Sequence, residues 1–230
     1  MEATEFRRWR VKGPEMEGAI ARWYAGIRGS QSQIETYRKQ AADLTTGLPA
    51  GTRILEVAPG PGHLAIEMAR SGRFAVSALD ISHTFVEIGS DNARKAGAAV
   101  DFRQGDVAAM PFEQGSFDLV VCQAAFKNFV RPNTALSEMF RVLRAGGTAV
   151  IDDMSHDASH ADIAEEVKGM GLGRVSSFMT TATLEMLRRR AYTRAQFERL
   201  AAQSPFHECE ISAAGIGLRV RLTKPGAAVA

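Results

Sequence analysis

The chain of 230 residues is 45% hydrophobic and 23% charged, and its net charge is +2. This composition is typical of a soluble globular protein, and the charge gives no argument for a nucleic-acid or membrane partner. No apolar run approaches the ~18 residues of a membrane span, and the first residues lack the apolar stretch of a signal peptide, so we expect a cytoplasmic protein. Cys122 and Cys209 are expected to be thiols in a reducing compartment.

Short β-rich runs alternate with helical patterns from residue 53 onward. Strands that alternate with helices form a mainly parallel sheet covered on both faces, so we expect an α/β fold with a Rossmann-like, doubly wound, seven-stranded sheet. Two strand-like runs within 207–223 have no helix between them, which predicts a hairpin and an antiparallel last strand. The other expected strands are 53–58, 74–80, 99–106, 117–123 and 148–153. The helices between them are expected to end at Gly72, at Gly97 and, for a helix over 133–147, at Gly146 and Gly147.

Two segments lie outside this sheet. Apolar residues recur at helical spacing over 14–44, and the insertion 154–190 is rich in methionine. Because methionine adapts its shape, the insertion favours an apolar helical lid over a flat substrate, with filler between lid and core as the alternative. We therefore expect an N-terminal helical cap (1–48), a ligand-binding domain (49–223) with a lid insertion (154–190), and a tail (224–230).

The stretch "ILEVAPGPGHLAIEMAR" places a stiff loop between the first strand and a helix. Gly60 and Gly62 allow the backbone to approach a ligand closely, and the helix beyond offers unpaired N–H groups. Pro59 and Pro61 fix the backbone and reduce the entropy lost on binding. The spacing of the glycines also fits a dinucleotide fingerprint, with Asp80 as the ribose ligand.

Three acidic residues at strand ends favour a different ligand. Glu56 lies just before the loop, where a carboxylate would repel a pyrophosphate but can hold an amino group. Asp80 can accept from two ribose hydroxyls, and Asp106 can accept from the exocyclic amine of adenine. A ligand with an amino-acid end, a ribose and an adenine, but no phosphate, matches S-adenosylmethionine (SAM). The structural alternatives are a buried ion pair for Glu56 and turn or N-cap roles for the two aspartates.

At these motifs the chain resembles the class I SAM-dependent methyltransferases over about residues 50–223, and "EMFRVLRAGGTAVIDD" is similar to small-molecule members that include quinone C-methyltransferases. Ala58 stands where the first motif of the family has a glycine, a departure that is tolerable if residue 58 has a negative φ. The resemblance implies that Glu56 and the loop hold the methionine part, Asp80 the ribose, Asp106 the adenine, and the residues after the fourth strand the sulfonium. The cofactor-binding set that it implies is Glu56, Ala58, Gly60, Gly62, His63, Leu64, Asp80, Ile81, Gly105, Asp106, Val107, Gln123, Ala124 and Phe126.

Methyl transfer from SAM needs alignment of the reactants more than a catalytic group, and a general base only where the acceptor must first lose a proton. The catalytic candidates are Tyr24, Asn128, His156 and His160. Tyr24 or Trp23 could touch the sulfonium or pack as core, and Asn128 could orient an acceptor oxygen or cap the next helix. His156 and His160, four residues apart and so on one helical face, could hold a metal with a nearby aspartate, serve as a base, or simply begin a polar helix. Lys127 is expected to be solvated.

The sequence therefore predicts an enzyme that transfers a methyl group to a small aromatic, quinone-like, indole-like or secondary-metabolite acceptor. The expected cofactor is SAM, the expected metal is none, and a homodimer is left open. A nucleic-acid methyltransferase is disfavoured because "QAAF" replaces the polar-Pro-Pro-aromatic motif after the fourth strand. Glu56 disfavours a nicotinamide-dependent oxidoreductase, and the intact loop argues against a SAM-binding protein without turnover.

Overall fold

The computed structural model describes residues 16–226. In chain order its elements are α1 (Gly18–Arg28), α2 (Gln31–Thr45), β1 (Arg53–Val57), α3 (His63–Ala69), β2 (Ala75–Asp80), α4 (His83–Ala96), β3 (Val100–Gln104), β4 (Phe117–Gln123), the 3₁₀ turn η1 (Phe126–Asn128), α5 (Pro132–Val142), β5 (Leu143–Met154), α6 (His160–Gly169), α7 (Arg174–Arg188), α8 (Arg194–Ala202), β6 (Glu210–Ala214) and β7 (Gly217–Thr223).

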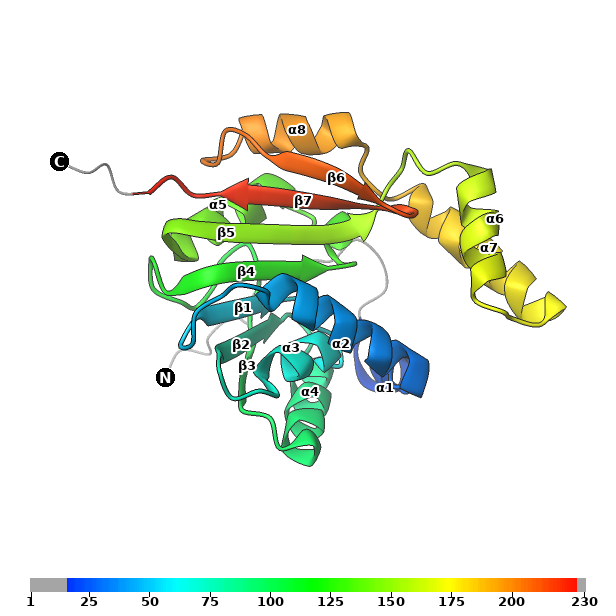
Figure 1. Ribbon diagram of the computed structural model, residues 1–230, viewed down its shortest axis with the longest axis horizontal. Coiled ribbons are helices and arrows are strands. Elements are labelled where there is room, and N and C mark those ends of the chain that lie inside the picture. The colour runs from blue at the N-terminus through cyan, green and yellow to red at the C-terminus, as the bar shows by residue number, and fades with distance from the viewer. Residues whose placement is uncertain (1–15, 227–230) are drawn as a thin grey trace, which may run out of the picture.

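The strands form one seven-stranded sheet in the order β3-β2-β1-β4-β5-β7-β6 (Figure 1). The pairings from β3 to β5 are parallel, and β7 is antiparallel to both of its neighbours. The predicted mainly parallel sheet with an antiparallel last strand is confirmed. Because the chain runs outward from β1 to β3 and then returns to β4, the order reverses between β1 and β4, which is where open α/β sheets bind ligands.

Two hydrophobic clusters cover the two faces of the sheet. Helices α5 and α8 pack on one face, with Leu136, Met139 and Phe197 in the cluster. Helices α2 and α3 pack on the other face, where Tyr37 and Leu64 join the cluster. Both faces of the parallel strands are thus buried, which explains their continuous apolar runs.

One helix is shorter than predicted. The pattern over 133–147 predicts a helix up to Gly146, but α5 ends at Val142 and the chain enters β5 at Leu143. Leu143 has extended φ and ψ of −72° and 138°, and it pairs with Phe117 on β4. The apolar spacing of a helix continues into this strand because Leu143 is buried in the same cluster as α5.

The cap and the lid lie at the end of the sheet where the parallel strands terminate (Figure 1). Helix α1 packs on α4, whereas α7 packs on α6 and projects away from the sheet. Several large apolar side chains on these helices are exposed, among them Trp23 on α1 and Phe178 on α7. Within residues 16–226, no helix is long and apolar enough to span a membrane.

The Phe102 ring fixes the approach of α3 and α4 to the sheet. A Cβ on Gly89 would lie 2.4 Å from Cε1 of Phe102, and a Cβ on Gly62 would lie 2.5 Å from Cζ of the same ring. Both contacts are too short for any side chain. Glycine at these two positions therefore allows the ring to pack between the helix and the glycine loop.

We expect Gly89→Ala to lower the free energy of unfolding by about 1–3 kcal/mol, the usual cost of overpacking a core. The control is Gly26→Ala on α1, where no atom lies within 4 Å of the added Cβ and alanine favours the helix. Urea unfolding of both variants checks this, and adding Phe102→Leu to Gly89→Ala should recover much of the loss. Equal stability of the two alanine variants would contradict the packing argument.

Candidate active site

The loop between β1 and α3 is strained and closely packed. Gly60 and Gly62 have positive φ values of 55° and 79°. Ala58 also has a positive φ, 54°, so the condition under which alanine would replace the glycine without strain is not met. Its N–H donates to the Leu79 carbonyl of β2 at 2.8 Å, which holds the alanine in the left-handed conformation that a glycine would adopt more easily.

Glu56 on β1 is a buried carboxylate without a full set of partners. Its side chain is 2% exposed, and its Oε2 atom has no hydrogen-bond partner within residues 16–226. Burial raises the pKa of Glu56 to about 8, an Ala65 backbone hydrogen bond lowers it in part, and the nearby Asp80 raises it further. A cationic ligand group would satisfy this oxygen and favour its charged form.

Asp80 at the end of β2 fixes the glycine loop as well as offering oxygens to a ligand. Its Oδ2 accepts from the Gly60 N–H at 3.0 Å, and its Oδ1 accepts from the Ser82 N–H at 2.9 Å. Burial raises the pKa of Asp80 to about 6 despite these hydrogen bonds. Since each carboxylate oxygen has two lone pairs, Asp80 can still accept from ribose hydroxyls.

Asp106 lies two residues beyond the end of β3. Its Oδ1 accepts from the Ala108 N–H at 2.8 Å, and its Oδ2 accepts from the Arg131 guanidinium at 2.7 Å. The hydrogen bond from Ala108 stabilises a turn, which is the structural alternative that the sequence analysis gave for Asp106. Its predicted contact with adenine would use the remaining lone pairs.

The C-terminal ends of β1 and β4 lie side by side at the switch point. Val57 pairs with Cys122, so Ala58 and Gln123 are the next residues of the two neighbouring segments. Gln123 Oε1 is a second buried atom without a hydrogen-bond partner among the described residues. Ala124 has a φ of 54°, which makes two left-handed alanines at the tips of these two strands.

One prediction for the following turn is wrong. The Phe126 side chain is fully buried in the core among Phe129, Tyr192 and Phe197, and its predicted place in the cofactor site stays a prediction. Lys127, expected to be solvated, is 5% exposed.

Lys127 forms a buried ion pair with Asp153 at the end of β5. Its Nζ donates to Asp153 Oδ1 at 2.7 Å and to the Ala124 carbonyl at 2.5 Å. Asp153 also accepts from the backbone N–H groups of Lys127 and Met154. The pair therefore fixes the turn that carries Gln123 and the strained Ala124 to the next strand.

The cap helix α1 covers the loop. A Cβ on Gly60 would lie 4.0 Å from Cε1 of Tyr24, and the Tyr24 ring meets Phe85 edge to face at 5.9 Å. The predicted position of Tyr24 beside the loop agrees with this geometry, and its catalytic role stays a prediction. Trp23 is 67% exposed, so it packs in no core.

The two histidines of the lid do not share a helix. Helix α6 begins at His160, and His156 lies in the turn before it. His156 Nδ1 lies 3.0 Å from the Arg188 carbonyl, and His160 Nδ1 lies 2.7 Å from Glu185 Oε1 on α7. These contacts tie the two lid helices together, and the predicted shared helical face is wrong because Ser159 forms the N-cap.

Asn128 is half-buried in η1 and does not cap α5, whose N-cap is Arg131. The alternative that Asn128 caps the following helix is therefore wrong. Its proposed role in orienting an acceptor oxygen stays a prediction.

Sequence reasoning missed Arg28 and Tyr37. The Arg28 guanidinium carbon lies 5.3 Å from the Tyr37 ring centre and 5.9 Å from the Tyr24 ring centre. His63, which the resemblance did include, lies beside Tyr37 with ring centres 5.7 Å apart. The signal for Arg28 was present, because a residue four positions after Tyr24 shares its helical face.

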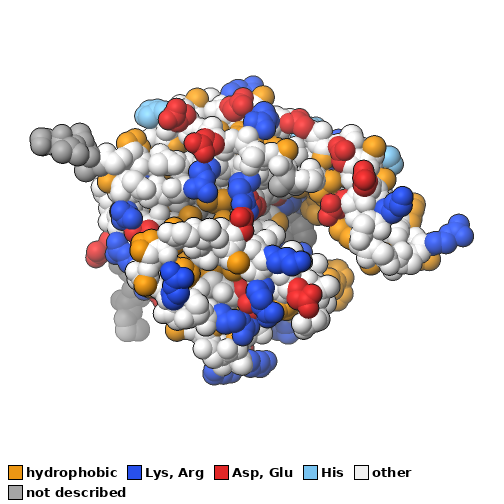
Figure 2. Space-filling model, in the orientation of Figure 1, with side chains coloured by type: hydrophobic (Ala, Val, Ile, Leu, Met, Phe, Trp, Pro, Cys, Tyr) orange, Lys and Arg blue, Asp and Glu red, His pale blue; other side chains and the backbone are white. Residues whose placement is uncertain are grey.

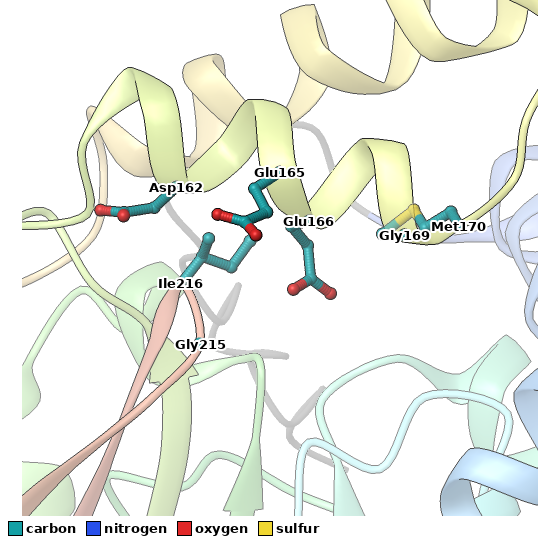
Figure 3. Close-up of a pocket in the computed structure, with 7 residues that line it drawn as sticks. All are labelled: Asp162, Glu165, Glu166, Gly169, Met170, Gly215 and Ile216. Atoms are coloured by element: carbon teal, nitrogen blue, oxygen red, sulfur yellow. The ribbon is translucent and has the colours of Figure 1, made fainter.

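The lid forms a separate hollow of about 480 Å³ between α6 and the β6–β7 turn (Figure 3). Figure 3 shows Glu165 and Glu166 extending from α6 toward this turn. Its lining residues are Asp162, Glu165, Glu166, Gly169, Met170, Gly215 and Ile216. None of these belongs to the predicted cofactor set, so the hollow is distinct from the loop site.

The sequence is similar to known proteins over about half of its length. Residues 55–151 match the family described as a methyltransferase domain. A demethylmenaquinone methyltransferase of Renibacterium salmoninarum is 35% identical over 127 residues, which cover 55% of this chain and 51% of that protein. The chain thus spans about half the length of this relative.

Solved structures share the fold. A candidate S-adenosyl-L-methionine-dependent methyltransferase of Methanococcus maripaludis aligns with a TM-score of 0.70 and 21% identity, covering 96% of this chain and all of that one. The [4+2]-cyclase SpnF aligns with a TM-score of 0.55 and 19% identity, covering 85% of this chain and 82% of its own. Because a cyclase has the same fold, the fold alone does not fix the reaction.

The chain therefore has the fold of solved SAM-dependent methyltransferases, and residues 55–151 match the family model of a methyltransferase domain. The predicted resemblance to this family is confirmed. The residues present fit the SAM that this family implies, since the unpartnered Glu56 oxygen suits an ammonium group and the open side of Gly60 suits a close backbone contact.

We expect Glu56→Gln to stabilise the free protein more at pH 8 than at pH 5. A carboxyl whose pKa is raised on folding destabilises the fold progressively as pH rises from its unfolded value of 4.5 to about 8. One pKa unit corresponds to ~1.4 kcal/mol, so the gain at pH 8 is several kcal/mol. Urea unfolding at both pH values checks this, and a gain independent of pH would contradict it.

We expect Lys127→Met to cost about 3–5 kcal/mol of stability, because it leaves the Asp153 charge buried and unpaired. The double variant Lys127→Met/Asp153→Asn keeps an acceptor for the two backbone N–H groups and should recover most of this loss. Thermal unfolding of the single and double variants measures the coupling. Additive losses would show that the pair does not act as a unit.

Proposed function

We propose that this protein binds SAM at the β1–β4 switch point and transfers its methyl group to a small, flat, largely apolar acceptor of the quinone type. The observation that carries the proposal is the buried Glu56 carboxylate with an unpartnered oxygen, next to a glycine loop fixed by Asp80. A cationic, phosphate-free ligand satisfies this arrangement better than a pyrophosphate does.

The chain would hold the two ends of the cofactor through different groups. Glu56 would accept from its ammonium group, and the Gly60 region would contact it through backbone. Asp80 would accept from the ribose hydroxyls, and Asp106 with Val107 would face the adenine. Bound SAM supplies an electrophilic methyl group on a positively charged sulfur.

The contribution of the chain to methyl transfer would be alignment and exclusion of water. Tyr24 lies over the loop, and the turn at Gln123 and Ala124 follows the neighbouring strand, so these residues would border the transferred methyl. Alignment of this kind can lower a barrier by ~7–11 kcal/mol. A strong general base is therefore not required, and the catalytic roles of Tyr24, Asn128, His156 and His160 remain part of the proposal.

The surfaces around the site support the proposed acceptor class. Trp23 on α1 and Phe178 on α7 are 67% and 76% exposed, and both helices lie at the ligand-binding edge of the sheet (Figure 1). Apolar side chains left open at this edge suit an aromatic acceptor. The quinone assignment draws on the relative from Renibacterium salmoninarum, whose described activity is methylation of demethylmenaquinone.

A nucleic-acid acceptor is less well supported. On the face drawn in Figure 2, the Lys and Arg side chains of the described residues lie among Asp and Glu side chains. Nucleic-acid binding depends on a concentrated basic surface that neutralises phosphates. The mixed charge favours a small molecule.

We expect S-adenosylhomocysteine, the product of the cofactor, to raise the melting temperature, whereas NAD(H) and NADP(H) should leave it unchanged. A ligand present at 100 times its dissociation constant adds ~2.7 kcal/mol of stability. Asp80→Ala should abolish the shift because it removes both the ribose acceptor and the support of Gly60, while Asp91→Ala on the exposed surface of α4 should preserve it.

Incubation with labelled SAM and a series of demethylated quinones and other aromatic compounds tests the reaction itself. A mass gain of one methylene unit on a quinone-type ring supports the proposal. Binding of S-adenosylhomocysteine without transfer to any aromatic acceptor would argue for a binding protein or for another acceptor class.

A further inference from the structure

The two ends of cap helix α1 are held in different ways. At its start, Glu17 accepts from the backbone N–H groups of His83 and Thr84 at 2.8 and 3.1 Å, and Ser82 Oγ donates to the Met16 carbonyl at 2.7 Å. Burial raises the pKa of Glu17, but the hydrogen bonds from Thr84 and His83 outweigh it, and the pKa is lowered overall. Glu17, the N-cap residue of α1, therefore anchors this end of the helix to the first turn of α4.

The other end of α1 is held by a stacked cation. The Arg28 guanidinium lies over the Tyr24 and Tyr37 rings, at 5.9 and 5.3 Å from their centres. Within residues 16–226, Arg28 forms no salt bridge, although the side chain is half-buried. The guanidinium also hydrogen-bonds the Tyr37 side chain. Stacking and this bond orient the guanidinium and leave its other donors for a carboxylate.

A buried histidine nitrogen without a hydrogen-bond partner lies beside this cation. His63 Nε2 is buried and has no hydrogen-bond partner in the described part of the chain. A Cβ on Gly29, the residue after Arg28, would lie only 3.7 Å from this nitrogen. Burial and the Arg28 charge lower the pKa of His63, which favours the neutral ring, and one nitrogen of a neutral imidazole donates a hydrogen bond.

The Tyr37 hydroxyl connects this pair to the cofactor site. Burial raises the pKa of Tyr37 to about 12, and the charges of both Arg28 and Glu56 act on it. A positive and a negative side chain therefore lie within electrostatic reach of one hydroxyl. The amino-acid end of SAM carries an ammonium and a carboxylate, and Glu56 can serve only the first.

We propose that Arg28, supported by His63, forms a subsite for the carboxylate of the cofactor and that filling this subsite fastens the C-terminal end of α1 over the glycine loop. The inference rests on the proposed function, because it takes an amino-acid-bearing nucleoside as the ligand. It adds a residue of the cap to the cofactor site and couples closure of the cap to recognition of one charged group.

The test uses two ligands that differ in one group. S-adenosylhomocysteine carries the carboxylate, and its decarboxylated analogue keeps the amine and the nucleoside. By calorimetry, Arg28→Ala should weaken binding of S-adenosylhomocysteine about 10- to 100-fold, as expected for loss of a charged hydrogen bond, and should change binding of the analogue by less than about twofold. Arg28→Lys should recover part of the affinity, because an ammonium keeps the charge but loses the fork.

Arg22→Ala is the matched control, because Arg22 is an exposed arginine on the same helix and should bind both ligands as the unaltered protein does. Hydrogen exchange gives a second measurement: S-adenosylhomocysteine should slow exchange at the C-terminal end of α1 more than the analogue does, and this difference should vanish in Arg28→Ala. Equal weakening of both ligands by Arg28→Ala, or no weakening of either, would overturn the subsite and leave the proposed function standing. Failure of the unaltered protein to bind either ligand would overturn both.

Discussion

The constraint on which this structure depends is the burial of the Glu56 carboxylate at the point where the sheet reverses its order. A carboxylate removed from water without a cation is costly, and the raised pKa of Glu56 expresses that cost. Asp80, which accepts from the backbone N–H groups of Gly60 and Ser82, raises the pKa of Glu56 further through its charge. Stability of the free protein and affinity for a cationic ligand therefore oppose each other at one residue.

The same edge of the sheet stores backbone strain. Ala58 and Ala124 adopt left-handed conformations directly after β1 and β4, and such residues persist only where their surroundings hold them. The Leu79 carbonyl holds the N–H of Ala58, and the Lys127 ammonium together with Asp153 holds the turn at Ala124. The buried ion pair, although it lies in the core, thereby determines the geometry of the strand tip beside the cofactor site.

The sheet, the glycine loop and the places of the three acidic residues at strand ends could be predicted from the sequence, because each depends on local residue spacing. Features that depend on contacts between distant residues could not be predicted. The positive φ of Ala58 depends on a carbonyl of β2, the burial of Lys127 depends on an aspartate 26 positions later, and the exposure of Trp23 depends on how α1 lies on α4. The end of α5 at Val142 was missed because Leu143 keeps the same apolar periodicity while pairing as a strand.

The cap and the lid reach the site through contacts of unequal strength. The cap is fastened by hydrogen bonds of Glu17 at one end, while α6 and α7 are joined to each other through the exposed His160 and the half-buried Glu185. An ion pair that is open to solvent contributes about 1 kcal/mol or less, so the buried Ile163 and Val167 of α6 hold the lid more firmly than this pair does. In the proposed function, the anchored start of α1 would let the cofactor order the cap first. The exposed apolar side chains of α1 and α7 would then close on the acceptor and exclude water from the transferred methyl.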